Sequence, residues 1–286
     1  MQLIGVDIGG SHISAASLTF NSGEVRLADF QESSIDTTAS ADALISAWSE
    51  VIRASAGGSQ NFKVGIAMPG PYDYQKGISL IQDQGKMKSL FKLSVKNLLA
   101  ESLDIPSTYL QFTNDAEAFL LGESLAGSGK DFKNSIGITL GTGLGSAIKM
   151  GDVVKDAKLW TAPFRDGIAE DYLGTNWFVA EAKKQFNLTI SGVKELGEST
   201  SIQQEADILF QIFGKALGEF LLPYLIRLQA EAVILGGKIA LLNARFLPAT
   251  TQYLIQNGCS AKIKISTLGE QAALIGACQP YINQKS

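Results

Sequence analysis

Four short apolar segments of the chain each end in a glycine-rich turn, and this feature limits the possible folds most strongly. The segments are Leu3–Gly10, Val64–Gly70, Ile136–Gly143 and Ala232–Gly237. Apolar runs of this length bounded by glycine predict buried β-strands. The first and third are followed by further strand-like runs, Ile13–Phe20 and Leu144–Met150. A strand–glycine turn–strand unit therefore occurs in each half of the chain, which indicates weak internal repetition of a subdomain.

Amphipathic helical patterns separate these strands. We expect helices over residues 41–54, 95–103, 115–124, 170–186, 203–228, 239–256 and 270–280. Strands mixed with helices of this length predict an α/β protein with mixed sheets flanked by helices. We place a domain boundary near Gln111, giving a smaller domain over residues 1–111 and a larger one over 112–269. The C-terminal helix, 270–286, is expected to pack back on the smaller domain.

Charge and hydropathy exclude several classes of partner. The formal net charge is −4 and the sequence pI is about 5.2, which favours neither nucleic acid nor an anionic membrane surface as a partner. The most apolar long stretch, Ile208–Leu228, contains Lys215, Glu219 and Arg227. We interpret it as a buried helix, and we expect no membrane span.

The cysteine and histidine counts exclude further chemistries. The two cysteines, Cys259 and Cys278, are typical of a reduced, cytoplasmic protein. The N-terminus has no basic region of the kind that begins a signal peptide. His12 is the single histidine, so a zinc site of one His and three Cys cannot be assembled, and a Ser-His-Asp triad would have to use His12.

The first glycine turn has the composition of a phosphate-binding loop. Bound triphosphates need several converging backbone N–H groups, and glycine lets the chain approach them closely. In the first turn Ser11 can donate a hydroxyl, and Asp7 is placed to hold a hydrated Mg²⁺. The candidate nucleotide ligands of this loop are Asp7, Gly9, Gly10, Ser11 and His12.

A second loop, Gly141-Thr142-Gly143, fits the same need from the other half of the chain, and Gly236-Gly237 suits the adenosine side. Any one of these loops alone is more simply an ordinary hairpin turn. Taken together they favour a joint clamp on one nucleotide. The chain has no Gly-x-x-x-x-Gly-Lys-Ser/Thr pattern, and a strand rather than a helix is expected after Gly143.

Asn114 and Asp115 lie where a strand is expected to become a helix. Asn and Asp are both favoured at helix starts, so capping alone explains one of them. In kinases a carboxylate accepts the proton of the attacking hydroxyl while positioning does most of the work. Combined with the flanking loops, Asp115 is therefore the candidate catalytic base, and both residues are candidates for contact with substrate.

In this order the motifs resemble the ROK family of sugar kinases and repressors, within the actin-like ATPase superfamily. The residues that carry the resemblance are Asp7–Ser11, Ala67–Pro71, Thr113–Ala116, Leu140–Gly145, Ile234–Gly237 and Gln271–Ala277. The resemblance implies a two-domain actin-like ATPase (ribonuclease H-like) fold with an inter-domain cleft. It also implies ATP and Mg²⁺ as cofactors, Asp115 as catalytic base, and Pro69 and Gly70 beside a sugar.

The chain departs from the family pattern on the sugar side. Family kinases usually carry a Glu-x-Gly-His motif and a Cys-rich zinc loop, and with His12 as the single histidine neither can exist here, so we expect no zinc. Glu170 lies in a stretch similar to the family's Leu-Glu-x-Tyr segment and is our first candidate for sugar contact, with Asp166 second. The alternative is an acidic helix start that favours the helix dipole. The family's Asn-rich sugar loop would fall near Gln84–Phe91, which lacks the expected Asn.

The sequence therefore predicts ATP-dependent phosphorylation of a sugar hydroxyl, on a hexose or hexose derivative, as in glucokinases. The alternative is a nucleotide- or sugar-binding regulator of the same family that has lost catalysis. Family repressors carry an N-terminal helix-turn-helix, and the expected first strand begins too early to leave room for one. The expected partner is a small sugar, and the oligomeric state, monomer or homodimer, stays open.

Overall fold

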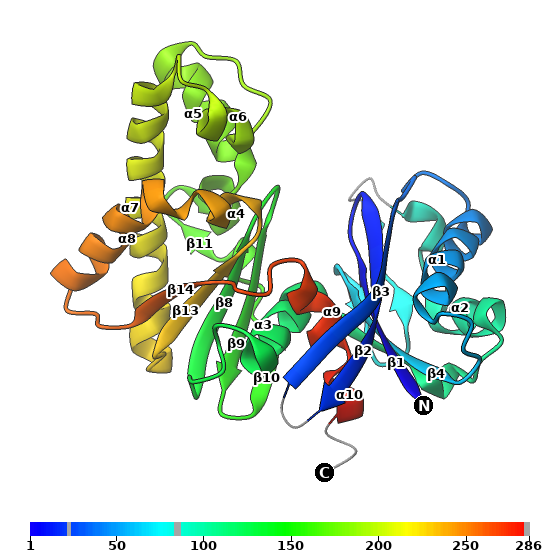
Figure 1. Ribbon diagram of the computed structural model, residues 1–286. Coiled ribbons are helices and arrows are strands. Elements are labelled where there is room, and N and C mark those ends of the chain that lie inside the picture. The colour runs from blue at the N-terminus through cyan, green and yellow to red at the C-terminus, as the bar shows by residue number, and fades with distance from the viewer. Residues whose placement is uncertain (22–23, 83–86, 283–286) are drawn as a thin grey trace. The chain divides into compact units, whose positions relative to one another are not determined.

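The computed structural model describes residues 1–21, 24–82 and 87–282, and the chain divides into two compact units (Figure 1). Unit 1 comprises Met1–Gly127 with Glu270–Ser286, and unit 2 comprises Ser128–Gly269. The first division falls after Gly127 instead of near Gln111, because the helix after residue 114 packs within unit 1.

Unit 1 is built on a five-stranded mixed sheet in the order β3-β2-β1-β4-β7. Strands β1, β4 and β7 run parallel, whereas β2 and β3 are antiparallel to their neighbours. Its elements are β1 (Gln2–Ile8), β2 (His12–Asn21), β3 (Glu24–Ser34), α1 (Ala41–Ser55), β4 (Phe62–Met68), β5 (Tyr72–Asp73), β6 (Ile78–Ser79), η1 (Lys88–Leu90), α2 (Val95–Leu103), η2 (Ser107–Tyr109), β7 (Leu110–Asn114), α3 (Asp115–Ala126), α9 (Gln271–Ala277) and α10 (Gln279–Ile282).

Alternation along β1 assigns its side chains to the two faces of this sheet. Ile4, Val6 and Ile8 are fully buried and join the apolar cluster that includes α1 and α2. On the other face, a Cβ added at Gly5 would lie 2.2 Å from the carbonyl oxygen of Leu274 in α9. Glycine is therefore needed in this strand so that α9 can lie directly on the sheet.

Unit 2 repeats the arrangement with the strand order β10-β9-β8-β13-β14, again with parallel pairing of β8, β13 and β14. The predicted internal repetition is thus present in the topology. The elements are β8 (Asn134–Leu140), β9 (Leu144–Met150), β10 (Val153–Asp156), η3 (Leu159–Thr161), β11 (Pro163–Phe164), β12 (Gly167–Ile168), α4 (Ala169–Tyr172), α5 (Thr175–Phe186), α6 (Val193–Glu198), α7 (Gln203–Leu228), β13 (Ala232–Gly236), η4 (Lys238–Leu242), α8 (Asn243–Gln256) and β14 (Lys262–Ile265).

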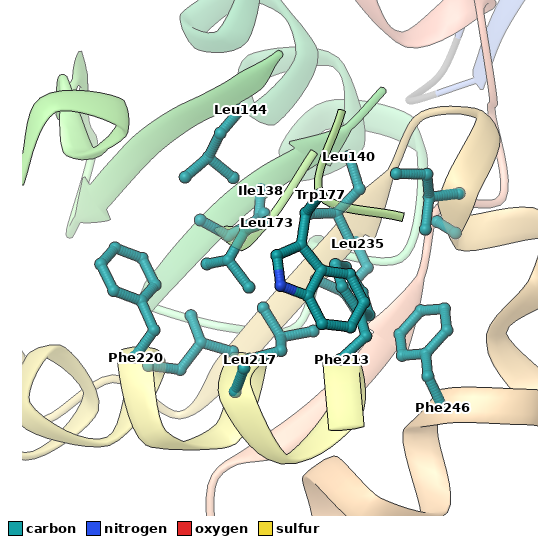
Figure 2. Close-up of a cluster of buried hydrophobic side chains, with 14 of the residues drawn as sticks. Ile138, Leu140, Leu144, Leu173, Trp177, Phe213, Leu217, Phe220, Leu235 and Phe246 are labelled. Carbon is teal, nitrogen blue, oxygen red and sulfur yellow. The ribbon is translucent and has the colours of Figure 1, made fainter. Parts of the chain in front are cut away.

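The core of unit 2 lies between this sheet and α7. Figure 2 shows Phe213 and Phe220 of α7 in the same cluster as Leu140 and Leu235 from the ends of β8 and β13. By length and composition α7 could cross a membrane, but 56% of its most apolar window is buried inside the structure. That burial agrees with the prediction of a core helix for Ile208–Leu228.

The helices expected over 170–186, 239–256 and 270–280 are interrupted, and several strands, among them β3, β10 and β14, were not predicted. The pattern over 170–186 forms α4 and α5, because Gly174 adopts an extended conformation between them. The pattern over 239–256 begins as the 3₁₀ turn η4 before α8. Strand β3 was missed because most of its side chains are exposed, so it has no apolar alternation to recognise.

Candidate active site

The candidate residues of unit 1 lie at the carboxyl ends of its parallel strands. Asp7 of β1 is the register partner of Ala67 in β4, and Met68 at the end of β4 is the partner of Asn114 in β7. The Pro69-Gly70 loop therefore follows β4 beside the start of α3. In open α/β sheets this edge is where ligands bind.

Asn114 and Asp115 begin α3 as predicted. Asn114 is the N-cap residue, and its Oδ1 accepts a hydrogen bond from the backbone N–H of Glu117 at 3.1 Å. Asp115 is the first helical residue, and its Oδ1 accepts from the Ala116 N–H at 2.9 Å. Asn114 is buried whereas Asp115 is exposed, so the Asp115 carboxylate can be reached by a substrate.

Asp7 lies in an unfavourable environment for a negative charge. Desolvation, followed by the charges of Asp115 and Glu270, raises the pKa of the Asp7 carboxyl to about 7. Glu270 immediately precedes α9 and was not among the predicted site residues. No sequence motif marks it, because only the packing of α9 on unit 1 brings it near Asp7.

The negative charge around Asp7 bears on the Mg²⁺ that is predicted there. Excess negative charge at Asp7 would be relieved by a divalent cation, and Mg²⁺ usually keeps several of its waters. Within the described residues, no group of three or more Asp, Glu, His or Cys side chains could hold a metal. Coordination of Mg²⁺ by Asp7 through water accordingly stays a prediction, as does the expected absence of zinc.

The first glycine loop connects β1 to β2 in a tight turn. The Gly9 N–H donates to the His12 carbonyl oxygen at 2.9 Å, and Ser11 Oγ lies 3.1 Å from His12 Nδ1. A Cβ added at Gly9 would meet no described atom closer than 3.5 Å, and the φ of Gly9 is not left-handed. Neither packing nor backbone conformation explains the glycine, which leaves room for close approach of a ligand such as a phosphate.

The second glycine loop, between β8 and β9, belongs to unit 2 and is open in the same way. A Cβ added at Gly141 would have no described atom within 4 Å, and φ there is also not left-handed. The Gly141 carbonyl accepts from both the N–H and the hydroxyl of Thr175, each at 2.9 Å. The start of α5 thus holds the loop through its carbonyl.

Glu170 holds the other end of this loop. Its Oε2 accepts from the Leu144 N–H at 2.9 Å and lies 2.6 Å from the position of a Cβ on Gly143. The loop over 141–144, including Thr142, is consequently supported by α4 and α5. Glu170 was predicted to contact sugar. In the structure its carboxylate accepts a hydrogen bond from the second glycine loop. Contact with sugar stays a prediction.

Gly236 and Gly237 lie next to this loop at the end of β13. Gly236 pairs with Thr139, and Gly237 has a φ of 84° with its Cβ position 2.3 Å from the Leu140 carbonyl oxygen. Backbone conformation and packing are therefore sufficient reasons for glycine at 237. A role on the adenosine side remains a prediction.

The two further acids near Glu170 have local partners. The Tyr172 hydroxyl donates to Asp166 Oδ1, and this hydrogen bond is the main cause that lowers the pKa of the Asp166 carboxyl. Asp171 Oδ2 accepts from the Ile168 N–H at 3.0 Å, as expected of an acid at a helix start. Of the expected sugar loop, Gln84–Lys86 lies outside the described residues.

Comparison with known proteins identifies the family. Residues 3–158, more than half of the 286-residue chain, match the model of the ROK family. The chain belongs to the ROK family. The matched range includes Asp115 and both glycine loops, and it ends before Asp166, Glu170 and Gly236–Gly237.

Curated proteins similar to this chain include glucokinases. A glucokinase of Thermotoga maritima is 29% identical over 171 residues, which are 60% of this chain and 49% of that protein. A glucokinase of Streptomyces coelicolor is 28% identical over 152 residues, 53% of this chain and 44% of that protein. The chain thus spans about half the length of the curated relatives it matches.

Solved structures share the fold. A ROK hexokinase from Thermus thermophilus has a TM-score of 0.78 at 22% identity, covering 100% of this chain and 99% of that one. A ROK glucokinase from Streptomyces griseus, in complex with glucose and AMPPNP, has a TM-score of 0.75 at 22% identity, covering 98% and 99%. The predicted actin-like ATPase fold is confirmed by this agreement.

Proposed function

We propose that this ROK protein transfers a phosphoryl group from ATP to a hydroxyl of a sugar, with Asp115 as general base. The observation that carries the proposal is the exposed Asp115 carboxylate in the first turn of α3. It lies close enough to Asp7, at the carboxyl edge of the unit 1 sheet, for its negative charge to raise the pKa of the Asp7 carboxyl. Asp115 would accept the proton that leaves the attacking sugar hydroxyl.

The glycine loops support nucleotide binding. Gly9 and Gly141 have open space where a side chain would stand, so the loop N–H groups can approach phosphate oxygens closely. Gly10, Ser11 and His12 would complete the first loop, and Thr142 and Gly143 the second. When bound, ATP would supply the phosphoryl group. Asp7 would hold Mg²⁺ through water, and the cation would neutralise negative charge on the phosphates.

On the sugar side, the candidate residues of unit 1 are Asn114, Pro69 and Gly70. For Glu170 and Asp166 of unit 2, contact with sugar is a proposal from the sequence alone. The solved relative that carries glucose supports a hexose or hexose derivative as substrate. Asn114 is the best supported of these residues, because it adjoins Asp115 and its amide can both donate and accept hydrogen bonds.

A cytoplasmic location is also part of the proposal. The two unpaired cysteines, Cys259 and Cys278, are in keeping with it.

The proposal is tested by incubating the purified protein with ATP, Mg²⁺ and a panel of hexoses and amino-sugars while ADP release is followed. Turnover with one sugar and its loss in Asp115→Asn would support it. The Asn variant retains a residue that can accept from the Ala116 N–H but cannot take up a proton, so turnover should fall about a hundredfold or more. Retention of most turnover in this variant would refute the assignment of the base.

A regulator without catalysis is the alternative outcome. A ROK transcriptional regulator shares the fold, with a TM-score of 0.74, covering 96% of this chain and 76% of that one. Calorimetric binding of a sugar together with absence of ADP release across the whole panel would favour that alternative over the kinase.

A further inference from the structure

Tyr74 connects the ends of two neighbouring strands in unit 1. Its hydroxyl donates to the carbonyl oxygen of Met68 at 3.1 Å and accepts from Asn114 Nδ2 at 3.1 Å. Met68 and Asn114 are register partners, the last of the β4–β7 pairing. The hydroxyl also lies 3.4 Å from the position of a Cβ on Gly70. One phenol oxygen therefore joins the Pro69-Gly70 loop to the residue before Asp115.

The N-cap hydrogen bond from Glu117 determines which way the Asn114 amide points. Oδ1 faces the Glu117 N–H, which can only donate, so the amide oxygen must be on that side. Nδ2 is then directed to Tyr74, and one of its two hydrogens is used there. The second hydrogen is the only donor that the side chain has left for a ligand. Asn114 is 7% exposed, so water competes little for this hydrogen.

We infer that Tyr74 is a positioning residue, which holds the Asn114 amide so that its remaining N–H meets an oxygen of the sugar next to Asp115. This inference rests on the proposed function. A sugar hydroxyl is the chemical group that suits the site, because it can accept from Asn114 while a neighbouring hydroxyl gives its proton to Asp115. Loss of the Tyr74 hydroxyl would leave the amide held by the Glu117 N–H alone, and alignment of the sugar would suffer.

Tyr72 provides a matched control. The centroid of its ring lies 5.2 Å from that of the Tyr74 ring and 5.3 Å from that of Phe112, on which it stacks. Its buried hydroxyl has no hydrogen-bond partner among the described residues. Tyr72→Phe and Tyr74→Phe thus remove the same atom from adjacent rings of one cluster, but only the second removes hydrogen bonds.

The first test compares kinetics with the sugar that the screen identifies. In Tyr74→Phe we expect kcat/KM for the sugar to fall about tenfold to a hundredfold, with the KM for ATP nearly unchanged. Tyr72→Phe should behave as the wild type. Asn114→Ser keeps a good N-cap residue but removes Nδ2, so it should show a similar loss, and adding Tyr74→Phe to it should cost little more. Additive losses, or equal kinetics in the two Phe variants, would overturn the inference.

A second test does not depend on turnover. In uniformly ¹⁵N-labelled protein, the side-chain amide hydrogens of Asn114 should exchange faster and shift in Tyr74→Phe, and neither change should occur in Tyr72→Phe. An unchanged Asn114 amide in Tyr74→Phe would overturn the inference whatever the activity. An altered amide in a protein that phosphorylates no sugar would uphold the role of Tyr74 in holding Asn114 and would count against the kinase instead.

Discussion

The raised pKa of Asp7 should make the ligand-free protein less stable as pH rises toward neutrality. The pKa of this carboxyl is raised from 3.8 to about 7, first by desolvation and then by Asp115 and Glu270. Between these two pH values the folded state keeps a proton that the unfolded state has lost. The free energy of unfolding must therefore decrease as pH rises through this window, and it levels off above about pH 7.

The magnitude follows from the size of the shift. Each pKa unit corresponds to about 1.36 kcal/mol, so the full shift of Asp7 is worth about 4 kcal/mol at most. Asp7→Asn removes the titrating group and cannot become charged. The variant should gain stability relative to wild type as pH rises from about 5 to 8. Glu270→Gln removes the smallest of the three causes of the raised Asp7 pKa. It should therefore also gain stability relative to wild type as pH rises, but by less than Asp7→Asn.

Urea unfolding without divalent cations would measure this difference across the same pH range. Wild type and Asp7→Asn should diverge progressively, with Asp7→Asn the more stable at the alkaline end. Mg²⁺ with a nonhydrolysable ATP analogue should narrow the gap, because a bound cation favours the ionised carboxylate of wild type. Parallel pH profiles of the two proteins in the absence of ligand would refute the reasoning.

Three further predictions concern the nucleotide side and the absence of zinc. Gly141→Val should weaken ATP binding at least about tenfold in calorimetry with an unchanged melting temperature, since no described atom lies within 4 Å of the added Cβ and φ is not left-handed. The control is Gly192→Val, which lies on extended backbone with its nearest contact at 3.7 Å. Equal ATP affinity in Gly141→Val and wild type would contradict the loop's role. Glu170→Ala should raise the Kd for ATP by about threefold to tenfold, because the Leu144 N–H loses its acceptor. Glu170→Gln keeps an acceptor there and should change the Kd less. An effect on the sugar KM alone would instead support contact between Glu170 and sugar. Chelation followed by resupply of Mg²⁺ should restore full activity, and stoichiometric zinc in the purified protein would disprove the expectation.

The local pattern of the sequence determined the elements that carry the site. The bounds of α2 and α7 agree with the expected ones, because apolar periodicity and caps are local signals. The cap at Asn114 follows in the same way from residues three positions apart. The two glycine turns indicated candidate phosphate loops, because glycine clusters after apolar runs are a local signal. Nucleotide binding by these loops stays a prediction.

Tertiary structure decided what surrounds those elements. Glu270 reaches Asp7 only because α9 returns to the unit 1 sheet, and glycines at positions 5 and 65 make room for it. Glu170 contacts the second glycine loop, and Tyr74 contacts Asn114, across gaps of 26 and 40 residues. Sequence periodicity reports which face of an element is buried, but not which distant element covers it. The pKa of the Asp7 carboxyl and the orientation of the Asn114 amide therefore depend on tertiary packing, because desolvation and hydrogen bonding act between residues that are distant in sequence.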